Sequence, residues 1–163
     1  NNLSDFLLTQ SPTINVPWVK GELTKEQFLS MRAFDIWAHD QDVRIAIGAP
    51  QNLMSNPGKD AAQRMFGTLP FIWGKKMGVP PGESLQLVFT GPDINGTLSI
   101  ETGPQDKAAF VSEPAGEITR IEIPWADFVN GYCGRVDPDV TATRMTGSGP
   151  RAQEFVNALA STP

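Results

Sequence analysis

The chain has 163 residues, of which 40% are hydrophobic and 19% are charged, and this composition is sufficient for a folded core in one domain or in two small ones. Its net charge is −5, and its 13 basic residues are scattered along the sequence, which argues against binding to a nucleic acid backbone. The longest apolar stretches are far shorter than the roughly 20 residues that cross a bilayer, so we expect no transmembrane helix.

The amino end reads as the middle of a structure. Residues 3–9 have the composition of the last turns of a helix, and a breaker-rich segment at 11–17 follows them. The chain begins at Asn1 without an initiator Met. We therefore expect it to be a fragment of a longer protein.

The strongest helix signal begins at Thr24. Thr24 and Gln27 have the spacing of a capping box, in which each side chain accepts a hydrogen bond from the other residue's backbone N–H. Apolar residues then recur at helical spacing as far as Ile47, and Gly48 and Pro50 are typical of a helix end. The sequence therefore predicts a helix of about six turns between these two signals.

A second helical segment is expected at 59–77, with a kink or a break at Gly67 and Pro70. A stretch rich in Gly and Pro closes this segment, and beyond it the periodicity changes from helical to alternating. We therefore expect two domains, one at 1–80 and the other at 81–163.

Alternating apolar and polar residues dominate the second half of the chain. The predicted elements are strands at 85–90, 97–102, 117–123 and 140–145 and helices at 124–132 and 151–160. The first two strands are separated by a Gly-Pro-Asp turn and are expected to form a hairpin. A mainly antiparallel sheet covered by helices on one face follows from this order, so we expect the α+β class.

The first long helix carries side chains that are suited to a metal ion. Asp35 and His39 are four residues apart, so on a helix their side chains lie on the same face. A carboxylate and an imidazole placed in this way can supply two ligands to one divalent ion. The alternative is an ordinary surface pair in which the carboxylate satisfies the histidine, and such pairs are common by chance.

The residues around this pair resemble a known family. The segment 37–50, Trp-Ala-His-Asp-Gln-Asp-Val-Arg-Ile-Ala-Ile-Gly-Ala-Pro, is similar to the Glu-x-Trp-x-His-x-x-Asp-x-Arg-x-x-Leu-Gly-x-Pro pattern of the maleylpyruvate isomerase-like and DinB-like metalloenzymes. In that family the pattern lies on the last helix of a four-helix bundle. The order of elements predicted for residues 83–160 also resembles the small sterol-carrier-like α+β domain that follows the bundle.

The resemblance implies a metal site that this chain holds only in part. The family binds a divalent metal, most readily zinc, through two histidines and an acidic residue. His39 matches one histidine and Asp35 matches the acidic ligand, although Asp is shorter than the usual Glu. His39 is the only histidine of the chain. The missing ligand would come from a longer protein or from a partner chain, unless the site has decayed.

The resemblance further implies a mycothiol-using isomerase or S-transferase that acts on a small carboxylated substrate. Asp42 is then expected to contact the thiol cofactor or to support His39. Arg44 and Arg135 are the candidates for holding the substrate carboxylate, because a guanidinium binds a carboxylate with two parallel hydrogen bonds. The alternatives are a solvated helix residue for Asp42 and surface ion pairs for the two arginines.

Two non-catalytic functions stay open. The sterol-carrier-like unit would serve as a module that binds a lipid or another small apolar molecule. Alternatively, the chain is a structural subunit whose exposed helix face, including Phe28, Met31 and Phe34, is covered by another chain or by a second copy. We expect no nucleic acid and no membrane among the partners.

The single cysteine, Cys133, cannot form a disulfide within the chain, which favours a reducing compartment, so we expect a cytoplasmic protein. Cys133 lies beside Tyr132 on an apolar helix, and we expect burial rather than reactivity. The four tryptophans are expected in the core: Trp18, Trp37, Trp73 and Trp125.

Overall fold

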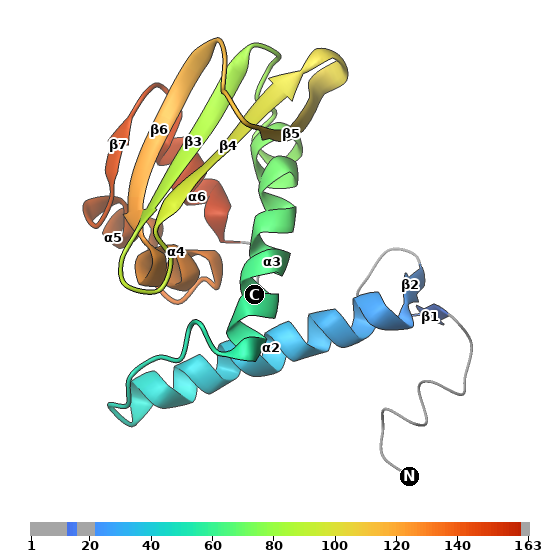
Figure 1. The fold of residues 1–163 in the computed structure, drawn as a ribbon, viewed down its shortest axis with the longest axis vertical. Helices are drawn as coiled ribbons and strands as arrows, with labels where there is room; N and C mark the ends of the chain where they lie inside the picture. The colour runs from blue at the N-terminus through green and yellow to red at the C-terminus, as the bar shows by residue number, and fades with distance from the viewer. Residues whose placement is uncertain (1–12, 16–21, 161–163) are drawn as a thin grey trace. The chain divides into compact units, whose positions relative to one another are not determined.

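The computed structural model describes residues 13–15 and 22–160, and Figure 1 shows their fold. The chain divides into two compact units, 1–63 and 64–163. The helix end expected at 3–9 lies outside the described residues. The expected domain boundary at 80/81 falls where the helical part of the chain gives way to the sheet.

The first unit contains a short hairpin and the long helix. Strand β1 (Thr13–Asn15) pairs antiparallel with β2 (Glu22–Thr24), and helix α2 (Lys25–Ala46) follows directly. The predicted capping box is present, because Gln27 N–H donates to Thr24 Oγ1 over 3.2 Å and Thr24 N–H donates to Gln27 Oε1 over 2.9 Å. Gly48, with φ of +70°, follows the last turn, as a helix-ending glycine does.

The second helical segment changes its helix type at Pro70, where the sequence predicts a kink or a break. Helix α3 (Asn56–Pro70) runs through Gly67 without a break and passes into the π-helical η1 (Phe71–Lys76) directly after Pro70. Proline has no N–H and its ring displaces the preceding turn, which explains the change of helix type at this residue. Gly67 costs the helix some stability but introduces no steric conflict, so it does not divide the helix.

The second unit is built on a five-stranded sheet in the order β5-β4-β3-β6-β7. Its strands are β3 (Glu83–Thr90), β4 (Gly96–Gly103), β5 (Lys107–Val111), β6 (Glu117–Pro124) and β7 (Thr146–Ser148). The β3–β4 hairpin is confirmed, with Leu87 opposite Leu98. Strand β6 pairs parallel with β3, and the other neighbours are antiparallel. The α+β class with a mainly antiparallel sheet is therefore correct.

One predicted element is wrong, and some short strands were not predicted. The strand expected at 140–145 is largely the helix α5 (Pro138–Thr143), because Asp137 caps its first turn by accepting from Asp139 N–H over 2.9 Å and Pro138 fits the first helical position. Strand β5 was not predicted. Its sequence, Lys-Ala-Ala-Phe-Val, lacks a clear alternation, and only pairing with β4 makes it a strand.

Helices cover one face of this sheet. Helices α4 (Trp125–Tyr132) and α6 (Ala152–Leu159) lie on the same side of it (Figure 1). The residues that point to this side are buried: Leu85, Leu87, Phe89, Ile100, Ile121 and Ile123. On the other face, Arg120 donates to Gln86 Oε1 over 2.9 Å and is exposed. This alternation is typical of an antiparallel sheet that has one covered face.

Aromatic side chains fill the space between the sheet and the helices. Phe89 packs edge-on against Trp125 and Phe128, with ring centroids 5.6 and 5.0 Å apart. Trp37, Trp73 and Trp125 are buried as predicted, whereas Trp18 lies outside the described residues.

Candidate functional site

Three side chains predicted to belong to a site lie together on α2. His39 Nε2 is 3.6 Å from Asp35 Oδ1, and His39 Nδ1 is 3.1 Å from Asp42 Oδ2. The helix alone produces this arrangement, because residues three and four positions apart are neighbours on its surface. The His39 side chain is 65% exposed, so the group lies on the outside of the described unit.

The separation of Asp35 and His39 fits two ligands of one metal ion. Two ligands of a tetrahedral zinc, each at about 2.1 Å, are about 3.4 Å apart, which is close to the 3.6 Å between Oδ1 and Nε2. Asp42 contacts the other ring nitrogen, and a carboxylate at that position commonly orients a metal-binding histidine. The donor set and its spacing therefore suit a divalent metal.

Arg32 takes part in the same group. Its Nη1 donates to Asp35 Oδ2 over 2.7 Å, while the other carboxylate oxygen, Oδ1, faces His39. The pair is about half exposed, so it adds little to stability. In this arrangement Asp35 Oδ2 is occupied by Arg32, and Oδ1 is turned towards the imidazole.

Among the described residues, the chain supplies two donors for a metal ion here, Asp35 Oδ1 and His39 Nε2. In the described part of the chain, no group of three or more His, Cys, Asp or Glu side chains is arranged to hold a metal ion. Two ligands from one helix bind a metal loosely, since protein zinc sites generally use three or four. Without a metal, the same geometry describes a histidine whose two ring nitrogens each face a carboxylate.

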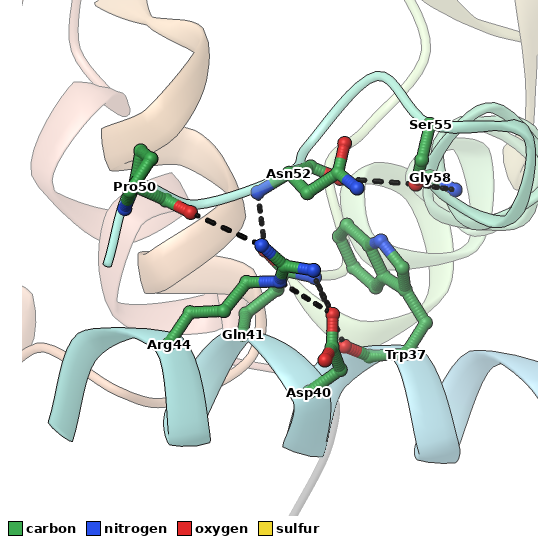
Figure 2. A network of polar contacts seen from close by, with 8 residues as sticks. All are labelled: Trp37, Asp40, Gln41, Arg44, Pro50, Asn52, Ser55 and Gly58. Atoms are coloured by element: carbon green, nitrogen blue, oxygen red, sulfur yellow. Dashed lines mark hydrogen bonds and ion pairs between the residues drawn. The ribbon is translucent and has the colours of Figure 1, made fainter. Parts of the chain in front are cut away.

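Arg44 is engaged at the end of α2. Its Nε donates to Asp40 Oδ2 over 2.7 Å, and its Nη1 makes a weak contact of 3.5 Å with the carbonyl of Pro50 (Figure 2). The first contact lies within the helix, and only the second reaches the segment that follows it. Its position therefore accounts for a structural role, while its part in binding a substrate stays a prediction.

Gln41 is the centre of this network, and its role was not predicted from the sequence. It is 3% exposed, and its Oε1 accepts from Asn52 N–H over 2.8 Å. Its Nε2 donates to Trp37 O over 3.3 Å and to Asp40 Oδ2 over 3.2 Å. Figure 2 shows Gln41 between the helix and the segment that carries Asn52. The available signal was its place in the row of buried positions that contains Phe34, Trp37 and Ala38.

The helix face expected to need a cover is not the one that the structure exposes. Phe34 is 6% exposed and lies against Trp37, with ring centroids 6.0 Å apart. Phe28 and Met31 are partly buried. The exposed apolar residues of the long helix are instead Ile36 and Val43, together with Ile45 and Ile47 near and beyond its last turn.

Arg135 belongs to the second unit. It follows α4, and its Nη1 donates to the backbone carbonyl of Cys133. Cys133 is buried, as predicted. Burial also raises the pKa of the neighbouring Tyr132 phenol, which shares a hydrogen bond of 2.8 Å with Thr68 Oγ1. These contacts hold the end of α4 in place, and a role of Arg135 in substrate binding stays a prediction.

The ion pair between Glu83 and Arg151 joins distant parts of the second unit. Both Arg151 Nε and Arg151 Nη2 donate to the Glu83 carboxylate, the latter over 2.9 Å. Hydrogen bonding from Arg151 lowers the pKa of Glu83, and the same contact raises the pKa of Arg151. This bidentate pair connects the start of β3 to the start of α6 and has no evident chemical role.

No protein-family model and no curated protein matches the chain. The resemblance to the metal-binding family therefore rests on the residues of α2 and on the order of elements that follows. Within the described residues, none of the helices combines the length and the apolar character needed to cross a membrane.

Proposed function

We propose that this chain is part of a divalent-metal-dependent, mycothiol-using isomerase or S-transferase of the maleylpyruvate isomerase type. The observation that supports this most directly is the placement of Asp35 Oδ1 and His39 Nε2 3.6 Å apart. Asp42 supports it further by contacting His39 Nδ1, because this contact leaves Nε2 as the nitrogen that faces Asp35.

In this function the residues of α2 bind and orient. His39 and Asp35 would hold the metal, while Asp42 contacts the imidazole and Arg32 contacts the carboxylate. When bound there, zinc would lower the pKa of a thiol and so provide a nucleophile at neutral pH. Arg44 and Arg135 remain the candidates for binding the carboxylate of the substrate.

The test is cobalt(II) binding, because cobalt reports its ligands by visible absorption. We expect the purified chain to give a cobalt spectrum that changes when mycothiol is added. His39→Ala and Asp35→Asn should each weaken cobalt binding by at least about tenfold. Asp139→Asn, which changes an exposed carboxylate on α5, is the matched control and should bind cobalt as the unaltered chain does.

The outcome that would contradict the proposal is equally specific. Equal cobalt binding by His39→Ala and by the unaltered chain would exclude His39 as a ligand. A spectrum that mycothiol leaves unchanged would remove the thiol from the mechanism, even if the metal binds at Asp35 and His39.

A second candidate is a non-catalytic scaffold or a module that binds lipids or other small molecules. The observation that favours it is the contact of 3.1 Å between His39 Nδ1 and Asp42 Oδ2, which gives the imidazole a hydrogen-bond partner without a metal. Under this alternative the metal content of the natural protein is negligible. Elemental analysis of protein purified without added metal distinguishes the two functions.

A further inference from the structure

Two Asn-Gly pairs occur in the chain, Asn95–Gly96 and Asn130–Gly131. Such pairs are prone to deamidation, because glycine has no side chain to shield its backbone nitrogen from the asparagine before it. The glycine nitrogen gives up its proton and forms a bond to asparagine Cγ, and the Cγ–Nδ2 bond breaks to release ammonia. Water then opens the resulting cyclic imide to aspartate or to isoaspartate. The sequence alone does not distinguish the two pairs.

The surroundings of the first pair leave it open to this reaction. Asn95 and Gly96 are both exposed, and Asn95 lies in the loop that joins β3 to β4. Within the described residues, the Asn95 side chain takes part in no hydrogen bond. A Cβ added to Gly96 would meet no atom within 4 Å, so the backbone has room to move at this position. The Gly96 nitrogen can therefore approach Asn95 Cγ in the folded chain.

Helix α4 protects the second pair. Gly131 is buried, and a Cβ added there would lie 3.2 Å from Thr141 Cγ2 and 3.3 Å from Leu159 Cδ2. The helix also engages the Gly131 N–H in a backbone hydrogen bond. The carbonyl of Asn130 accepts from Arg135 N–H over 2.8 Å. Because closure of the imide ring requires the backbone to leave the helical conformation, α4 must open before Asn130 reacts.

We propose that Asn95 is a site of spontaneous deamidation in the folded protein and that the fold protects Asn130 from the same reaction. The change needs only water and adds a negative charge to a chain whose net charge is −5. In the isoaspartyl product, an additional carbon enters the backbone directly before β4. Gly96 lies opposite Phe89, so this product strains the strand pairing beside a buried aromatic residue. No residue of α2 takes part, so the modification is independent of the proposed metal site.

The experiment incubates the folded chain at mildly alkaline pH and follows both sites by peptide mapping with mass spectrometry. We expect deamidation at Asn95 to be at least about tenfold faster than at Asn130, which reacts only in molecules whose α4 has opened. In guanidinium chloride, which unfolds the chain, the two sites should react at similar rates. Gly96→Ala should slow the reaction at Asn95 severalfold, because the added methyl group shields the nitrogen. Gly67→Ala, at a helical glycine with equally open surroundings, is the matched control and should leave that rate unchanged.

Each contrary result overturns the inference in a recognisable way. Equal rates at Asn95 and Asn130 in the folded chain would show that the fold does not select between the two pairs. Deamidation of Asn95 only after unfolding would show that the loop between β3 and β4 protects it as well. Equal rates in Gly96→Ala and Gly67→Ala would exclude attack by the Gly96 nitrogen. Circular dichroism of both variants ensures that a changed rate does not come from a lost fold.

Discussion

At the scale of single residues, the polar side chains of α2 have two different kinds of role. Asp35, His39 and Asp42 lie on the outside of the helix, where His39 contacts both carboxylates and Asp35 also accepts from Arg32. Gln41 is buried and bonds to backbone groups on both sides of the turn that follows the helix. The first group is available for chemistry, while Gln41 holds the chain in place.

Gln41→Leu should therefore destabilise the first unit. The substitution keeps most of the volume but leaves Asn52 N–H without its acceptor, which costs about 1–2 kcal/mol. The measurement is urea unfolding combined with amide hydrogen exchange at Asn52, which should become faster. Gln63→Leu, at an exposed position on α3, is the matched control. Unchanged exchange at Asn52 would mean that Gln41 does not hold this segment.

At the scale of secondary-structure elements, local signals account for where the helices begin and end. The capping box at Thr24, the glycine at 48 and the proline at 70 each act through backbone groups within a few residues. These signals are readable from the sequence because their physics is local. The segment at 140–145, which was predicted as a strand, also has a local helix signal. Asp137, just before its β-branched residues, caps the helix α5.

Thr24→Ala tests the strongest of these signals. Loss of the hydroxyl removes the hydrogen bond from Gln27 N–H and should cost about 1 kcal/mol of stability. Urea unfolding followed by far-ultraviolet circular dichroism measures the change. Ser30→Ala removes an exposed hydroxyl from the interior of the same helix and should not destabilise it, because Ala favours helix. Equal effects of the two substitutions would argue against the capping box.

At the scale of the whole molecule, contacts between residues far apart in sequence hold the second unit together. Glu83 and Arg151 join the first strand of the sheet to the last helix across 68 residues. Pairing of β3 with β6 likewise connects segments that are separated by the strands β4 and β5. None of these contacts has a local signal.

The Glu83–Arg151 pair should make stability depend on pH. The pKa of Glu83 is lowered in the folded state, so its contribution is fully present above the ordinary carboxyl value of 4.5 and is lost as the pH falls through the folded pKa. Glu83→Gln should cost about 1–2 kcal/mol at pH 7 and much less in acid. Urea unfolding at a series of pH values checks this. A difference that stays constant down to acid pH would contradict it.

The sequence by itself determined the class of the fold, the helix limits set by caps and breakers, and the Asp35–His39 spacing, because all of these follow from periodicity and from local backbone chemistry. Only the tertiary structure decided that β6 lies parallel beside β3, that β5 is a strand, that Gln41 and Arg44 hold the segment after α2, and that Ile36 rather than Phe34 is exposed. The physical reason is that pairing and burial depend on which distant segments meet, and the spacing of residues along one element does not specify its neighbours.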